Sequence, residues 1–276
     1  MKHINRLHSL RSAFKTLALA WAVAAGLGTG RALADSVDVS GYVTSPKDVV
    51  GVDNTANMTG DMTFGWQTYG CAIPVINNGF LFSMDSGGGN YYNYTGEILG
   101  TGGLYIGAGG IDTLHIGGGA GNTYTGATVV NNGPVSLEKS SGNALCGAIT
   151  VQGTGGLVWT ASDQIDDASD VTLTSTASLD LDGFPDSINE LHLVSGSIVQ
   201  TGVGGVLKVA KLFLDDVQQP ETAHVAGDGF VLGSGYIEVG ASGAPVITDP
   251  PSAPANPVPA DSSASVSPAV PQLQLG

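Results

Sequence analysis

The chain has 276 residues, of which 42 are glycine and only 12% are charged. Its glycines follow no Gly-X-Y period, which excludes a collagen helix. Five of the nine basic residues, and none of the 24 acidic residues, lie in the first 34 positions, so residues 35–276 carry a net charge of −20. Such a surface repels the phosphates of nucleic acids and anionic lipids, and we expect neither as a partner.

Residues 1–34 have the pattern of a signal peptide. Basic residues precede an apolar run at residues 17–27, and Ala32-Leu33-Ala34 supplies the small residues of a cleavage site. Eleven apolar residues are too few to span a bilayer as a helix, although an uncleaved anchor or a buried helix is the alternative. We therefore expect export, with Asp35 as the mature N-terminus and no membrane span after cleavage.

Residues 35–92 are predicted to form an N-terminal cap and the first rungs of a solenoid. Short alternating pieces such as Val37-Asp38-Val39 lie between Gly, Asn and Asp turns, and Trp66 and Tyr69 are available as bulky plugs. The end of a solenoid needs less repetitive sequence, because an open terminal rung exposes apolar side chains and unpaired backbone.

Residues 93–243 are predicted to be the repeat region of an all-β, right-handed parallel β-helix. Alternating apolar residues flank glycine and asparagine corners throughout residues 114–137. The Tyr-Thr-Gly sequence at Tyr94 recurs thirty residues later at Tyr124, a period typical of stacked repeats. At twenty to thirty residues per coil, residues 36–240 would make about seven to ten rungs. Alternation places Leu, Ile and Val inside and Thr, Ser, Asp, Lys208 and Glu238 outside.

Residues 244–276 are predicted to be a disordered tail. Eight of the thirteen prolines lie in residues 245–276, and Ser and Ala fill most of the remainder. Such a composition cannot bury enough apolar surface to become ordered. No recognised sorting signal closes the chain.

Residues 77–239 resemble the autotransporter-associated β-strand repeat of Gram-negative passenger proteins. The likeness is most specific in residues 122–130, N-T-Y-T-G-A-T-V-V, and continues through Val135-Ser136-Leu137. It implies a passenger-type β-solenoid, here without the C-terminal translocator barrel. Pro134 replaces a usual strand residue, so its strand should lie at an edge or begin just after it. Asp216 replaces a usual turn glycine.

Two patterns approach those of known chemical sites, and for each a structural interpretation is favoured. Residues 107–115 approach a calcium-binding nonapeptide, but Ala108 replaces a required glycine. Paired aspartates are found in β-helical polysaccharide hydrolases, but here the alternation of Asp180 and Asp182 with leucines points both carboxylates outward. The related polysaccharide lyases commonly use an arginine as the base, and residues 35–276 contain no arginine. The paired aspartates are Asp166-Asp167, Asp180 with Asp182, and Asp215-Asp216.

The remaining histidines and cysteines give no catalytic or metal signature. His115, His192 and His224 lie far apart without the spacing of a zinc site. Cys71 and Cys146 are 75 residues apart, and either a disulfide or two buried thiols is consistent with an exported chain. We therefore expect no catalytic, cofactor-binding or metal-binding residues.

The sequence favours an exported structural or adhesion-like β-solenoid with no catalytic activity, located outside the cell, on its surface or in the periplasm. Surface carbohydrate, an envelope protein or end-to-end self-association would supply its contacts. The alternatives are a β-helical polysaccharide-active enzyme and a truncated remnant of an autotransporter passenger, which barrel strands encoded downstream would reveal.

Overall fold

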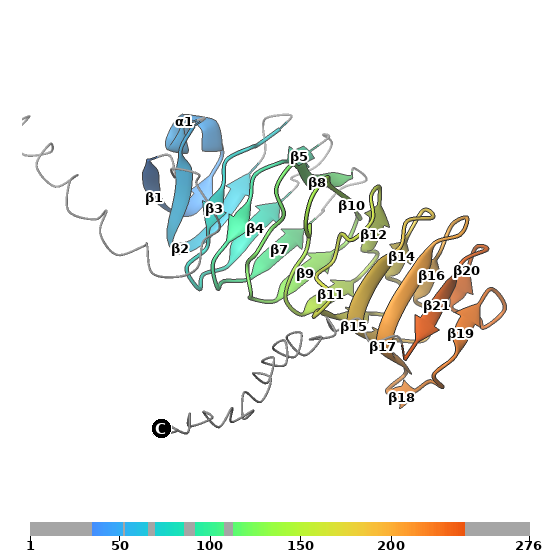
Figure 1. Cartoon of the computed structure of the whole chain (residues 1–276). Helices are drawn as coiled ribbons and strands as arrows, with labels where there is room; N and C mark the ends of the chain where they lie inside the picture. Colours follow the sequence, from blue (N-terminus) through green and yellow to red (C-terminus); the bar gives the residue numbers. More distant parts are fainter. Residues whose placement is uncertain (1–34, 52, 66–69, 86–91, 108–112, 241–276) are drawn as a thin grey trace, which may run out of the picture. The chain divides into compact units, whose positions relative to one another are not determined.

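The computed structural model describes residues 35–51, 53–65, 70–85, 92–107 and 113–240. In these ranges the chain forms a parallel β-solenoid of about eight turns with one short helix (Figure 1). This confirms the predicted all-β solenoid. The predicted signal peptide, the proline-rich tail, Trp66, Tyr69 and most of the calcium-like segment lie outside the described residues. No helix in the described part is long and apolar enough to cross a membrane.

Two sheets run along the solenoid, and we call them sheet A and sheet B. Sheet A has 14 strands, at β1 (Ser36–Val43), β2 (Thr55–Gly65), β3 (Val75–Ile76), β4 (Phe82–Asp85), β6 (Ile98–Leu99), β7 (Leu104–Gly107), β9 (Thr128–Asn131), β11 (Ile149–Gln152), β13 (Asp170–Leu173), β15 (Asp186–Leu193), β17 (Val206–Leu214), β18 (Val217–Gln218), β19 (Ala223–Val225) and β21 (Tyr236–Val239). Sheet B has seven, at β5 (Tyr92–Tyr94), β8 (Leu114–Gly118), β10 (Pro134–Lys139), β12 (Gly156–Trp159), β14 (Ser178–Asp180), β16 (Ile198–Gln200) and β20 (Val231–Leu232).

Each central coil contributes one strand to sheet A and one to sheet B, and an irregular third side closes it. Consecutive sheet A partners from Tyr105 to Phe213 are 20 to 24 residues apart in the sequence. The thirty-residue spacing of the Tyr-Thr-Gly sequences is therefore not the coil period. Tyr94 pairs with Ile116 in sheet B, whereas Tyr124 lies outside the strands, between β8 and β9, where the neighbouring Thr123 N–H donates to the Ile98 carbonyl.

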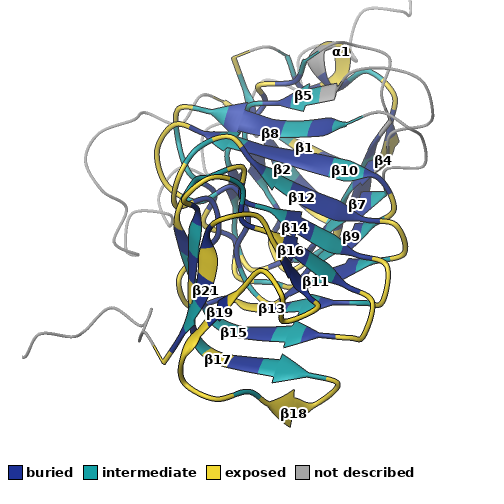
Figure 2. Cartoon of the chain, turned by 90° about the vertical axis from the view of Figure 1, so that its right-hand side faces the viewer, coloured by how far each residue is buried: buried dark blue, intermediate teal, exposed yellow. Residues whose placement is uncertain are grey.

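The core is a column of buried side chains between the sheets, formed largely by every second residue of the strands. In β11, Ile149 and Val151 are buried while Thr150 is partly exposed. Figure 2 shows buried and partly exposed segments along the strands of both sheets. Parallel register places each inward aliphatic side chain on its equivalent in the next coil, so burial is continuous. As predicted, Lys208 is exposed and Glu238 lies on the outward, partly exposed side of β21.

The two ends of the solenoid are built differently. At the N-terminal end the helix α1 (Pro46–Val50) packs against β1 and β2. At the C-terminal end the chain reverses at Asp215 and Asp216, whose φ values are 49° and 62°, and β18 and β19 pair antiparallel with β17 and β21. Two consecutive positive φ values are those of a tight hairpin turn. Pro134 is the first residue of β10, close to the predicted strand start.

Candidate functional site

A regular surface is formed by a row of outward side chains on sheet A, which we call the outer row. Its members are partners in successive strands and each is partly exposed. At about 4.8 Å between neighbouring strands, the four steps from Tyr105 to His192 cover about 19 Å. The outer row consists of Tyr105, Val129, Thr150, Thr172, His192 and Phe213.

Amide side chains follow one side of the outer row. Asn131 and Gln152 each lie two residues beyond an outer-row residue, so both face the same way as the row. Asn131 Nδ2 donates to the Tyr105 hydroxyl at 2.9 Å, and Gln152 Nε2 lies 3.4 Å from Asn131 Oδ1. These contacts fix the tyrosine ring and align the amides along the solenoid. We call these two amides the amide flank, and include in it Thr174, which lies two residues beyond Thr172 in the next coil.

A cluster of charged and aromatic side chains occupies the C-terminal end of the row. The His192 ring stacks on Phe213, with centroids 4.4 Å apart and planes 7° from parallel. Glu190 accepts hydrogen bonds from Lys211 at 2.6 Å and interacts with His192 at 3.2 Å. The hydrogen bond from Lys211 lowers the pKa of Glu190, and the same contact raises the pKa of Lys211.

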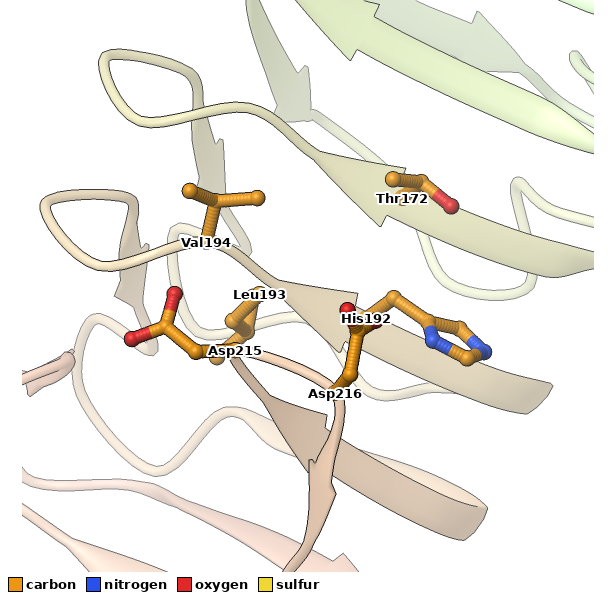
Figure 3. Close-up of a pocket in the computed structure, with 6 residues that line it drawn as sticks. All are labelled: Thr172, His192, Leu193, Val194, Asp215 and Asp216. Carbon is orange, nitrogen blue, oxygen red and sulfur yellow. The ribbon is translucent and has the colours of Figure 1, made fainter.

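A pocket of about 380 Å³ opens beside this cluster. Figure 3 shows Thr172 on β13, His192 on β15, and the two aspartates on the turn after β17. Asp215 accepts from the Ser195 N–H at 2.8 Å and from the Ser195 hydroxyl, and the hydroxyl contact lowers its pKa. The lining residues are Thr172, His192, Leu193, Val194, Asp215 and Asp216.

The structure thus brings together two of the sequence candidates, His192 and the Asp215-Asp216 pair, although they are separated by more than twenty residues. Asp166 and Asp167 line a different pocket of about 500 Å³ with Asp163. Burial raises the pKa of Asp167, and the neighbouring aspartates raise it further. No group of three or more His, Cys, Asp or Glu in the described ranges is arranged to hold a metal ion.

The other paired aspartates lie on the outside, as predicted. Asp180 is partly exposed and Asp182 is exposed, while the intervening Leu181 is buried. The Asp180 carboxylate accepts from the Asp182 N–H at 3.1 Å, which stabilises the local turn. These carboxylates are solvated groups rather than an opposed catalytic pair.

A histidine, serine and glutamate meet on the outer face of sheet B, a grouping that sequence analysis missed. His115 and Ser136 are register partners, and Glu138 follows on the same face of β10. Glu138 Oε1 contacts both His115 Nδ1 and the Ser136 hydroxyl, the latter at 2.7 Å. In a nucleophilic triad the serine donates to the histidine, whereas here it donates to the carboxylate. The signal for this grouping was the strand register, which the sequence did not reveal.

The interior holds a second unpredicted feature, a line of buried polar side chains formed by Lys139, Gln164 and Asp186, which we call the buried polar chain. Lys139 Nζ donates to the Gly96 carbonyl at 2.8 Å, and its backbone N–H donates to Gln164 Oε1 at 2.8 Å. The Gln164 N–H in turn donates to Asp186 at 3.0 Å. At this corner the interior therefore holds charged and amide side chains as well as apolar ones.

Burial perturbs both ionisable members of the buried polar chain. Asp186 accepts from Trp159 Nε1 and from the backbone N–H groups of Gln164, Ile165 and Ser187. Burial nevertheless raises the pKa of Asp186 to about 6, against the opposing effect of these donors. Burial lowers the pKa of Lys139 to about 8. These hydrogen bonds join Asp186 to Trp159, Gln164 and Ile165 of the preceding coil, which is a structural role.

The cysteines and the last histidine are also held inside the fold. Cys71 and Cys146 are both buried and no disulfide joins them, so the open choice between a disulfide and two thiols resolves to thiols. Burial raises the pKa of Cys146 to about 12, which disfavours a reactive thiolate. His224 is buried at the C-terminal end, 3.0 Å from Asp228.

No protein-family model, curated protein or solved structure matches this chain. The resemblance to the autotransporter-associated repeat remains a prediction from the sequence. The fold and its surfaces therefore have to support the functional argument.

Proposed function

We propose that this protein is an exported, structural or adhesion-like β-solenoid that works outside the cell or on its surface and catalyses no reaction. The observation that carries the proposal is the outer row. It is a regular line of partly exposed side chains, none of them Asp, Glu, Lys or Arg, on strands whose other face packs into the core. Regular sheet faces of this kind offer contact area for a partner. A fold by itself does not specify a function, whereas the side chains of a particular surface can.

The arrangement of reactive groups supports a role without catalysis. The Ser136 hydroxyl donates to the Glu138 carboxylate, an order that differs from the serine-to-histidine hydrogen bond of a nucleophilic triad. Cys146 is buried with a raised pKa. Lys139, whose pKa of about 8 would suit a nucleophile, is buried and donates to the Gly96 carbonyl.

The first 34 residues support export, because their basic, apolar and small-residue segments follow the order of a signal peptide. The test is to express the full chain in a Gram-negative host, fractionate the cells and sequence the N-terminus of the recovered protein. We expect protein beginning at Asp35 outside the cytoplasm. Full-length protein retained in the cytoplasm would contradict the proposal.

The exported protein should adhere without turning its ligand over. Protein recovered from the exported fraction is applied to surfaces coated with cells or extracellular matrix, and in parallel is incubated with neutral and acidic polysaccharides. Retention on the surface without new reducing ends supports the proposal. Release of reducing ends would establish the polysaccharide-active alternative instead.

A further inference from the structure

We propose that the outer row of sheet A is a binding trough for a linear, uncharged polysaccharide that lies along the solenoid axis. This inference rests on the proposed adhesive function and adds the site and the chemical class of its ligand. It is carried by the shape of the row, by the amide flank and by the distribution of charge.

Within the outer row, the aromatic side chains lie toward the two ends and the smaller side chains lie between them. Tyr105 stands at one end, and the stacked rings of His192 and Phe213 stand at the other. Between them lie three smaller side chains, those of Val129, Thr150 and Thr172, in consecutive strands. The floor between the rings is about 19 Å long, which suits a chain of several sugar rings rather than a monosaccharide.

The polar groups around the trough match a ligand rich in hydroxyl groups. The methyl groups of Val129, Thr150 and Thr172 and the faces of the aromatic rings suit the C–H faces of sugar rings. The amides of Asn131 and Gln152 supply donors and acceptors along one edge, already aligned by their mutual contact and by Tyr105. Hydroxyl groups can both donate to and accept from such amides.

The pocket at the C-terminal end adds acceptors for one end of the ligand. Thr172 and His192 belong both to the trough and to the pocket, so the two are continuous. Across the pocket, the carboxylates of Asp215 and Asp216 can accept hydrogen bonds from sugar hydroxyls. The pocket's volume of about 380 Å³ lies at the small end of the range for ligand sites, in keeping with a single terminal sugar.

The charge distribution selects an uncharged ligand. The outer row contains no Asp, Glu, Lys or Arg, although residues 35–276 carry a net charge of −20. The surrounding acidic surface repels anionic polymers such as uronic-acid chains. Asp170, Glu190 and Lys211 lie two residues before Thr172, His192 and Phe213, and Lys211 contacts Glu190 at 2.6 Å, which offsets the charge of one of these two acids.

The test measures binding of cellohexaose to the exported protein by isothermal titration calorimetry, with maltohexaose, xylohexaose and an acidic oligogalacturonate as comparison ligands. Thr150→Arg places a long side chain in the middle of the trough. Val158→Arg is the matched control, since Val158 is an outward residue in sheet B of the same coil and is also partly exposed. Circular dichroism and the thermal midpoint confirm that both variants fold.

We expect at least one neutral hexasaccharide to bind, the acidic one to bind more weakly, and Thr150→Arg to weaken binding by about tenfold or more, which corresponds to about 1.4 kcal/mol. Val158→Arg should leave the affinity within about twofold of wild type. Absence of binding to all three neutral chains, or equal losses in the two variants, would overturn the trough. If adhesion to cells or matrix persists unchanged in Thr150→Arg, the trough is wrong while the adhesive function stands. Loss of adhesion with Thr150→Arg alone supports both.

Discussion

Two groups of charged residues in this protein respond to their surroundings in opposite ways. In the buried polar chain, the pKa of the acid Asp186 is raised to about 6 and that of the base Lys139 is lowered to about 8. On the outer face of sheet A, the pKa of the acid Glu190 is lowered and that of the base Lys211 is raised. Burial penalises charge in the first group, whereas an opposite charge in solvent favours it in the second.

The comparison teaches that the two groups stabilise the fold to different degrees. Asp186 satisfies four N–H groups at a corner with no access to water, so its removal leaves buried donors without acceptors. The contact between Glu190 and Lys211 competes with water on both sides, and such surface pairs contribute little. The predictions below test this contrast, from the largest expected effect to the smallest.

Asp186→Ala should be the most damaging of these substitutions. It leaves Trp159 Nε1 and the N–H groups of Gln164 and Ile165 unsatisfied in the interior, at an expected cost of about 3 to 5 kcal/mol. Urea unfolding followed by circular dichroism measures the loss. Glu238→Ala, which removes an outward carboxylate from β21, is the control and should change stability by less than about 0.5 kcal/mol. Equal losses would refute a special role for Asp186.

As the pH rises from about 4 to about 6, the free energy of unfolding of the wild-type protein should decrease relative to that of Asp186→Asn. The pKa of Asp186 is about 6 in the folded state, against an ordinary 3.8 that applies in the unfolded chain. In this pH window the folded state therefore holds more protons than the unfolded one. Stability therefore decreases as the pH rises, by about 2 to 3 kcal/mol in the difference between the two proteins. Unfolding curves at successive pH values give the profile. A flat difference, or a carboxyl carbon that titrates near pH 4 by NMR, would contradict the assignment.

Lys139→Met should stabilise the protein at neutral pH. The folded-state pKa of Lys139 is about 8 against an ordinary 10.5, so at pH 7 the fold holds a charge that burial disfavours. Methionine removes this charge and keeps the apolar volume, although the Gly96 carbonyl loses its donor, and we expect a net gain of about 1 to 2 kcal/mol. Since the wild type gains stability as Lys139 loses its proton between pH 8 and 10.5, the advantage of the variant should vanish near pH 10. An advantage independent of pH would point to packing alone.

Lys211→Met applies the same chemical change on the surface and should have the smallest effect. Lys211 donates to Glu190 in solvent, so its loss should not move the thermal midpoint beyond experimental error. Differential scanning calorimetry of the two lysine variants side by side makes the comparison direct. A midpoint that drops with Lys211→Met and not with Lys139→Met would invert the contrast.

The buried position of Lys139 could be predicted from the alternation of residues within its own strand. In β10, Val135, Leu137 and Lys139 are buried at every second position, so the period of two already placed Lys139 inside. Charged side chains generally face solvent, however, and this tendency predicts the opposite orientation for Lys139. Asp186 is harder to predict, because its partners Trp159, Gln164 and Ile165 come from earlier parts of the chain and meet it only once the coils stack.

The sequence by itself determined the solenoid, because alternating apolar residues between glycine and asparagine corners specify inward and outward sides within each strand. It also determined that Asp180 and Lys208 face solvent. Only the tertiary structure decided the coil period, the alignment of the outer row and the meeting of His192 with Phe213 and the Asp215-Asp216 turn. These depend on how many residues each irregular third side takes to close a coil, a non-local balance of packing and backbone hydrogen bonds that no short stretch of sequence encodes.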